Sequence, residues 1–196
     1  MTGPVVGDDG LPRCPWGDAP ADYRAYHDTE WGRPVHGDSA IFERLSLEAY
    51  QAGLSWLTIL RRRDAFREAF AGFDIATVAG YGDAEVQRLA TDPGLIRHRG
   101  KVEAVVGNAR LLARWQEEEG EGALDALIWS CVAPAKPPRT LDDVPAQTAE
   151  SRRLAQLLRL RGWRFIGPTS AYAALQAMGV ANDHLVDCHA RGDATR

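Results

Sequence analysis

The stretch Leu47-Glu48-Ala49-Tyr50-Gln51-Ala52-Gly53-Leu54-Ser55-Trp56 lies where two helical patterns of this 196-residue chain meet. Before it, from Ser39 onward, apolar residues recur at steps of three and four, which is the period of a helix. After it, Ser55 can cap a second helix, whose apolar side carries Trp56, Ile59, Leu60, Phe66 and Phe70. The stretch therefore predicts two helices joined by a turn at Gly53.

Helical patterns continue further along the chain. Short helices are expected at residues 74–79 and 83–90, and longer ones near 102–115, 122–131, 149–161 and 169–178. The turn-rich Thr91-Asp92-Pro93-Gly94 and the proline-rich residues 134–145 interrupt them as loops. Gly162 and Gly179 follow the last two helices, where glycine commonly ends a helix. With no alternating strand pattern of useful length, the sequence predicts an all-α fold.

The composition is that of a single globular domain. Hydrophobic residues make up 45% and charged residues 26% of the chain, which excludes a disordered or collagen-like protein. No apolar run could cross a bilayer, and the first residues show no secretory signal. The odd count of cysteines (Cys14, Cys131, Cys188) is typical of a reducing compartment. We expect a cytoplasmic protein without membrane association, with residues 1–12 as a flexible leader and 190–196 as a tail.

The charge distribution matters more than its sum. A net charge of −4 argues against nucleic-acid binding when taken alone. Basic residues nevertheless gather at 61–63 and again at 97–101, whereas acidic residues gather at 117–121. One basic face for phosphates is therefore compatible with the acidic total, although residues 61–63 could equally serve to solvate a helix face.

Cysteine and histidine occur together near both ends of the chain. Cys14 and His27 lie thirteen residues apart, and His184 and Cys188 lie four apart. Two thiolates and two imidazoles would complete a tetrahedral Zn²⁺ site, and the four-residue step lets His184 and Cys188 share one face of a helical turn. The alternative is that the cysteines are ordinary thiols and the histidines surface groups, and His189 could replace Cys188 as a ligand.

Aromatic residues and one carboxylate form a second constellation. Tyr23 and Tyr26 lie with Trp16 and Trp31 in the N-terminal segment, while Glu48 and Trp56 flank the turn at Gly53. A carboxylate among aromatic rings could bind a flat, cationic, hydrogen-bonding ligand. Alternatively, the rings belong to the core and Glu48 is solvated at the edge of its helix.

The stretch Leu95-Ile96-Arg97-His98-Arg99-Gly100-Lys101-Val102 lies between two predicted helices. A glycine-containing hairpin at a helix N-terminus points backbone N–H groups outward, where they can bind phosphate. Because glycine-containing helix connections are common, the motif alone is weak support for DNA binding.

Taken together, these segments resemble the DNA-3-methyladenine glycosylase I family of the helix-hairpin-helix glycosylase superfamily. The resemblance rests on Arg13-Cys14-Pro15-Trp16, on residues 23–34, on the stretch quoted first, on Ile96-Arg97-His98-Arg99-Gly100-Lys101 with Gly107-Asn108-Ala109, on Phe165-Ile166-Gly167-Pro168-Thr169, and on Asn182-Asp183-His184 through Cys188. It spans residues 13–189, and several separate motifs in the same order make it specific.

The resemblance implies a role for each of these groups. Cys14, His27, His184 and Cys188 would bind one structural zinc ion. Apart from the resemblance, a monomer is the default expectation. Glu48 would be the catalytic residue that reads the edge of the extruded base, with Tyr23, Tyr26 and Trp56 lining its pocket. Leu54 would fill the gap left in the duplex, and Arg99, Gly100 and Lys101 would contact DNA. The family lacks the aspartate that most glycosylases of the superfamily use, and here that region is the Glu- and Gly-rich stretch around residues 117–122.

The activity implied is excision of 3-methyladenine from alkylated double-stranded DNA, with the free base and an abasic site as products. Methylation at N3 already weakens the glycosidic bond, because the base departs neutral, so strong acid catalysis is not needed. Two alternatives remain: a non-catalytic module that binds damaged DNA, and a zinc hydrolase. The hydrolase would need an open metal coordination position, which four Cys and His ligands would not leave.

Overall fold

The N-terminal residues form a small hairpin in the computed structural model, which describes residues 3–133 and 136–192. Strands β1 (Val5–Val6) and β2 (Pro12–Arg13) pair antiparallel, with Val5 opposite Arg13. Arg13 is 2% exposed and binds Asp9 at 2.6 Å and Asp28 at 2.8 Å. Residues 3–12 are therefore tied to the domain rather than forming the loose leader expected. Residues 1–2 of that leader and 134–135 of the expected loop lie outside the described residues.

Helices make up most of the remaining chain. The α-helices are α1 (Ala21–Thr29), α2 (Asp38–Gln51), α3 (Trp56–Leu60), α4 (Arg63–Ala69), α5 (Ile75–Ala79), α6 (Asp83–Thr91), α7 (Arg99–Glu119), α8 (Ala123–Trp129), α9 (Ala149–Leu160) and α10 (Pro168–Ala177). Short 3₁₀ turns are η1 (Pro15–Gly17), η2 (Ala71–Phe73), η3 (Leu141–Asp143) and η4 (His189–Arg191). Apart from the two-residue strands, the prediction of an all-α fold is confirmed.

The helix expected to follow Ser55 is two helices. Ser55 caps α3 as predicted, because its hydroxyl accepts a hydrogen bond from the Thr58 amide at 3.3 Å. The chain then leaves helical geometry at Arg62 (φ −108°, ψ 2°), and α4 starts in a new direction. This change of direction places Phe66 against Tyr50 of α2, with ring centroids 4.6 Å apart. Packing of the large rings therefore overrides the continuous helical pattern.

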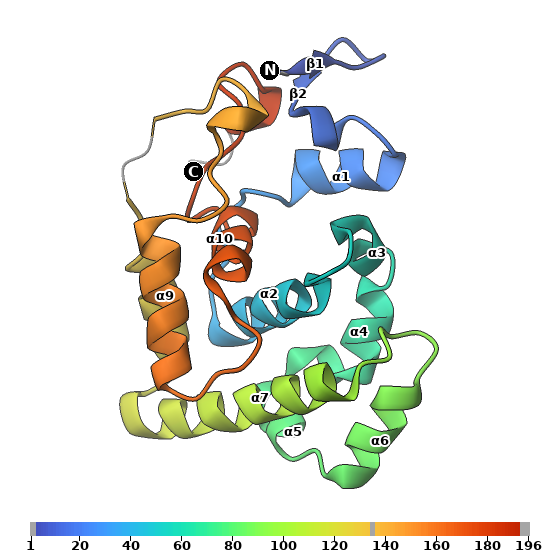
Figure 1. Cartoon of the computed structure of the whole chain (residues 1–196), viewed down its shortest axis with the longest axis vertical. Helices are drawn as coiled ribbons and strands as arrows, with labels where there is room; N and C mark the ends of the chain where they lie inside the picture. Colours follow the sequence, from blue (N-terminus) through green and yellow to red (C-terminus); the bar gives the residue numbers. More distant parts are fainter. Residues whose placement is uncertain (1–2, 134–135, 193–196) are drawn as a thin grey trace.

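Helix α1 was not among the expected elements. Only Tyr26 and His27 of its nine residues are buried, so the segment lacks the apolar stripe that reveals a helix in sequence. It lies beside the N-terminal hairpin, at the end of the molecule shown uppermost in Figure 1.

Helix α2 occupies the centre of the core (Figure 1). It packs against α10 on one side and against α3, α7 and α8 elsewhere, while α5 and α6 pack on α7 and α9 packs on α10. Near the N-terminal hairpin, β2 contacts η4, so the two ends of the described chain meet. Among the described residues, no helix is both long and apolar enough to cross a membrane.

The end of the chain is also held in place. Ala190 is 2% exposed, and the Arg191 guanidinium donates to the carbonyls of Asn182 and His184. The described part of the expected tail therefore packs on the domain, whereas residues 193–196 lie outside the described residues.

Candidate functional site

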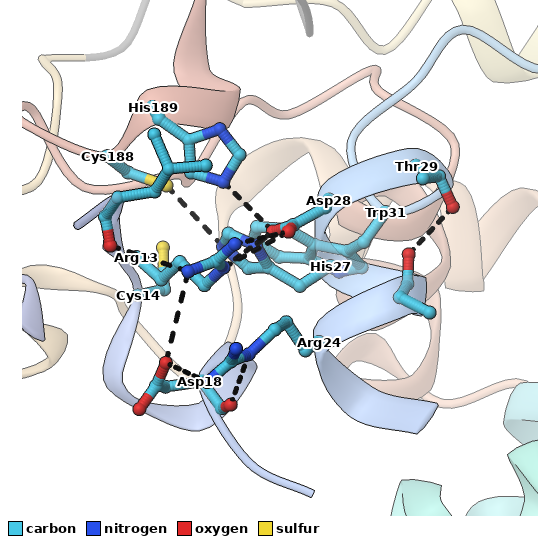
Figure 2. Close-up of polar contacts among 12 residues, drawn as sticks. Arg13, Cys14, Asp18, Arg24, His27, Asp28, Thr29, Trp31, Cys188 and His189 are labelled. Atoms are coloured by element: carbon cyan, nitrogen blue, oxygen red, sulfur yellow. Dashed lines mark hydrogen bonds and ion pairs between the residues drawn. The ribbon is translucent and has the colours of Figure 1, made fainter. Parts of the chain in front are cut away.

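The four predicted metal ligands meet in one buried cluster. Ligand atoms of Cys14, His27, His184 and Cys188 all lie within 4.8 Å of one another. The Cys188 sulfur is 3.5 Å from His27 Nε2 and 3.6 Å from His184 Nδ1, and the Cys14 sulfur is 3.8 Å from His184 Nδ1. Figure 2 shows Cys188 directed at His27, from opposite ends of the chain. The histidines are therefore not surface groups, and the two thiols lie beside them.

The surroundings of the cluster orient both imidazoles. His27 Nδ1 is 2.8 Å from Asp28 Oδ1, and His184 Nε2 is 3.1 Å from the Trp31 carbonyl oxygen. A histidine that ligates a metal commonly donates its second N–H in this way, which leaves the other nitrogen free for the ion. His189 binds Asp28 at 3.0 Å instead of replacing Cys188 (Figure 2).

The chemistry of the cluster suits a thiophilic cation. The hydrogen bond from Cys14 lowers the pKa of the Cys188 thiol, with further contributions from His184 and His27. The same contact raises the pKa of the Cys14 thiol, so one thiolate, the form that binds metal, is favoured in this pair. Gly17 allows the close packing, because a Cβ atom at this position would overlap the His27 ring. These donors and their support fit Zn²⁺ in a closed, four-ligand site.

A pocket of about 360 Å³ lies beside this cluster, and all four residues predicted to form the base site line it. Glu48 comes from α2, Trp56 from the start of α3, and Tyr23 and Tyr26 from α1. Tyr26 and Trp56 pack at 5.4 Å between ring centroids, and the Tyr23 hydroxyl accepts a hydrogen bond from the Leu57 amide at 2.9 Å. The turn at Gly53, whose φ is +85°, brings α3 back towards α1 and so assembles these walls.

Glu48 is a buried acid at the wall of this pocket. It is 5% exposed, so the alternative of a solvated glutamate at the helix edge is wrong. Burial raises its pKa to about 8, opposed by the positive charge of Arg44. Among the described residues, eight buried side-chain polar atoms have no hydrogen-bond partner, and two of them, Glu48 Oε2 and the Trp56 indole nitrogen, belong to residues that line the pocket. In this pocket the two atoms suit a ligand that donates to the acid and accepts from the indole.

Sequence reasoning missed part of the pocket wall. Trp16 and Trp31, named in the aromatic constellation but given no place in the pocket, line it, and so do Gln51, Gln176 and Asp183, which were not considered. Trp16 joins the two sites, because its ring lies 5.1 Å from the His27 ring and 5.8 Å from the Tyr23 ring. The available signal was proximity in sequence: Trp16 lies two residues from Cys14, and Asp183 immediately precedes His184.

Asp183 is held firmly at the pocket wall. Its carboxylate accepts hydrogen bonds from the Tyr172 hydroxyl and from the Gln176 amide, the latter at 2.8 Å. Burial raises the pKa of Tyr172, and the hydrogen bond to the Asp183 carboxylate raises it further. Both donors come from α10, so this helix sets the position of the carboxylate.

The predicted DNA contacts divide into exposed and buried residues. Leu54 is 40% exposed immediately after Gly53, as a protruding residue requires. Arg99 and Gly100 form the first turn of α7, where the exposed Arg99 side chain also binds Glu103 at 2.8 Å. Lys101 is 6% exposed, and its ammonium group donates to the carbonyls of Tyr50 and Ala52. The expected phosphate contact of the Lys101 side chain is therefore wrong, because backbone acceptors inside the protein already bind its ammonium.

Residues 61–63 are engaged within the protein as well. Arg61 binds Asp22 at 2.5 Å, Arg62 donates to the Pro93 carbonyl at 2.9 Å, and Arg63 binds Glu30 at 2.5 Å. The run is thus a set of intramolecular contacts rather than three unpaired surface cations.

Comparison with known proteins agrees with this geometry. The family model for methyladenine glycosylase matches residues 16–191. The chain is 41% identical to DNA-3-methyladenine glycosylase 1 of Escherichia coli, over 91% of this chain and 96% of that protein. It is 42% identical to DNA-3-methyladenine glycosylase of Haemophilus influenzae, over 90% and 96%.

Solved structures share the fold. A crystal structure of 3-methyladenine DNA glycosylase I matches with a TM-score of 0.85 and 40% identity, covering 90% of this chain and 98% of that one. The Staphylococcus aureus enzyme, solved to explain 3-methyladenine recognition, matches with a TM-score of 0.85 and 32% identity, covering 91% and 96%. On sequence and structure alike, this chain belongs to the methyladenine glycosylase family.

Proposed function

We infer that this protein is a DNA glycosylase that hydrolyses the N-glycosidic bond of 3-methyladenine in alkylated duplex DNA. It releases the free base and leaves an abasic site. The observation that carries this conclusion is Glu48, a buried acid whose Oε2 has no hydrogen-bond partner, in an aromatic pocket of about 360 Å³.

The pocket selects its base by charge. An ionised carboxylate at Glu48 is disfavoured in the empty pocket, because burial raises its pKa to about 8. An adenine methylated at N3 carries a positive charge in DNA, and its entry offsets that desolvation. The faces of Tyr26 and Trp56 add cation–π attraction. Neutral adenine brings no charge, so it gains none of this attraction.

The chemistry of the substrate explains why so modest a site suffices. When the C1′–N9 bond breaks, its electron pair moves to the cationic base, which departs neutral. A water molecule supplies the oxygen that bonds to C1′ and loses a proton to solvent. No residue has to protonate the leaving base, and the protein contributes selection and orientation.

Access to the base requires its extrusion from the duplex, at a cost of a few kcal/mol that is smaller for damaged bases. We propose that Leu54 enters the vacated space, as its exposed position after Gly53 allows. Arg99 and the Gly100 amide would bind phosphates at the N-terminus of the 21-residue helix α7. Phosphate contacts of this kind hold DNA without reading sequence, which suits a repair enzyme.

We propose that Cys14, His27, His184 and Cys188 hold one structural zinc ion, whose bound state would fix the two ends of the chain against each other. Four protein ligands leave no open position for water, which argues against a zinc hydrolase. The three cysteines are all unpaired thiols, and we propose a monomer that works in the cytoplasm.

The decisive experiment compares three proteins on alkylated duplex DNA: wild type, Glu48→Gln and the matched control Glu43→Gln. Glu43 lies on the same helix and binds Arg67 at 2.9 Å, away from the pocket. Released bases are identified by chromatography, and abasic sites are counted by strand cleavage. We expect Glu48→Gln to lower excision roughly 10- to 100-fold, because the free energy of a hydrogen bond to a charged group corresponds to a rate change of this size. Glu43→Gln should leave excision unchanged.

Two results would contradict this assignment. Undiminished excision by Glu48→Gln would remove Glu48 from the site. Tight binding of alkylated DNA by the wild type, with no released base, would favour the non-catalytic damage-binding module.

A further inference from the structure

Lys101 connects α7 to the end of α2. It lies in the first turn of α7, yet its ammonium group points into the protein and donates to the Tyr50 carbonyl at 2.8 Å and the Ala52 carbonyl at 2.9 Å. Tyr50 belongs to the last turn of α2, and Ala52 is the first residue beyond it. The last carbonyls of a helix lack partners within it and form the negative end of its dipole, so a cation there stabilises the helix end.

The turn that carries Leu54 begins at this point. The Leu54 amide donates to the Gln51 carbonyl at 2.6 Å, and Gly53 takes a positive φ of +85°. Ser55 then caps α3. The backbone on the α2 side of Leu54 is thus fixed by two bonds from Lys101 and one from the turn itself, whereas the Leu54 side chain stays 40% exposed.

The other end of the connection is the segment expected to bind DNA phosphates. His98 caps α7 by accepting a hydrogen bond from the Lys101 amide at 3.2 Å, and Arg97, His98 and Arg99 are exposed. If the phosphates of a duplex bind at this segment, the position of Leu54 relative to that duplex depends on the contacts that join the start of α7 to the Leu54 turn. Lys101 is the buried, charged link in that path.

We propose that Lys101 is a positioning residue that fixes the Leu54 turn relative to the start of α7, so that Leu54 enters the duplex when the phosphates are bound. This proposal rests on the proposed function, in which Leu54 fills the space of the extruded base. It requires Lys101 for extrusion from a duplex, and not for binding the free base or for breaking the bond of an unpaired nucleotide.

The test uses Lys101→Met, which keeps the length and apolar stem of the side chain and removes its charge. Arg110→Met is the matched control. Arg110 also lies on α7. Its guanidinium donates to the carbonyl of Ala79, the last residue of α5, at 2.9 Å and to that of Tyr81 just beyond this helix, far along the chain from Leu54. Excision is measured under single-turnover conditions on alkylated duplex and alkylated single-stranded DNA. Binding of free 3-methyladenine is followed by tryptophan fluorescence.

We expect Lys101→Met to lower duplex excision about tenfold or more, while single-strand excision and free-base binding stay within about twofold of wild type. Arg110→Met should change none of the three. In a Leu54→Ala background, Lys101→Met should have less than about a twofold further effect, because coupled residues are not additive. Equal losses on duplex and single strand, or independent effects of the two substitutions, would overturn the proposal.

Amide hydrogen exchange gives a readout that does not depend on activity. Exchange at residues 50–56 should become faster in Lys101→Met and stay unchanged in Arg110→Met. If the wild type releases no base while exchange still responds to Lys101→Met, the glycosylase assignment fails. The structural role of Lys101 in fixing the Leu54 turn would still hold. Should Lys101→Met fail to fold, Lys101→Arg replaces it, because arginine keeps a cation and donors, and we expect it to retain duplex excision. If Lys101→Arg loses duplex excision alone, faster exchange at residues 50–56 would support the proposal. The same loss with unchanged exchange would overturn it.

Discussion

Replacing Glu48 by Gln should make the free protein more stable at pH 8 than the wild type, by an amount that grows with pH. In the folded protein, burial raises the pKa of this carboxyl from 4.5 to about 8. In the unfolded chain the carboxyl ionises near its ordinary value. Below about pH 4.5 both states hold the proton, and folding costs nothing at this site. As the pH rises towards 8, only the unfolded state loses its proton, so stability is lost.

The magnitude follows from the size of the shift. Each unit of pKa difference corresponds to about 1.4 kcal/mol. A folded pKa of about 8 against 4.5 unfolded gives a loss of about 1 kcal/mol at pH 5 and about 4 kcal/mol at pH 8. The unfolding free energy of Glu48→Gln minus that of wild type should therefore rise by about 3 to 4 kcal/mol across this range.

Urea denaturation of both proteins at several pH values measures this difference. The Cys and His cluster titrates alike in both, so its contribution cancels. A difference that stays constant within about 1 kcal/mol between pH 5 and pH 8 would refute the reasoning, since Glu48 would then ionise as an ordinary solvated carboxyl. Addition of a cationic 3-methyladenine nucleoside should reverse the order and favour the wild type, because the ligand binds the folded state through the ionised acid.

Two further predictions concern the metal cluster. Cys14→Ser or Cys188→Ser should lose zinc and thermal stability together, because the free energy of metal binding is also folding free energy. The control Cys131→Ser, at a buried thiol outside the cluster, should keep its zinc. Metal analysis of the purified variants distinguishes these results. Gly17→Ala should destabilise the protein by about 1–3 kcal/mol and speed zinc loss to a chelator, because its Cβ would overlap His27; a variant with normal zinc retention and stability would contradict the packing described.

The sequence alone determined most of the helices. Regular apolar spacing located α2, α7, α9 and α10, and the Ser55 cap was placed correctly. Gly162 and Gly179 both adopt positive φ just beyond α9 and α10, as their positions predicted. These features depend on neighbouring residues along one chain segment, so they are visible in a linear pattern.

Residue type and spacing singled out the Cys and His residues and the Glu48 group, with alternatives left open, and the resemblance to a known family assigned their roles. The structure brings Cys14 and Cys188 into one cluster and places Glu48, Tyr23, Tyr26 and Trp56 around one pocket. Their roles in catalysis and metal binding stay predictions until the variants are assayed.

Only the tertiary structure decided where the charged groups point. In the sequence, Lys101 follows Arg99 in a basic run, and both were expected to contact DNA. The structure exposes Arg99 and buries the Lys101 ammonium against α2. It likewise leaves Glu48 Oε2 without the hydrogen-bond partner that a buried carboxyl oxygen usually has. The physical reason is the same in both cases: desolvation and hydrogen bonding depend on atoms supplied by distant segments, which no local pattern records.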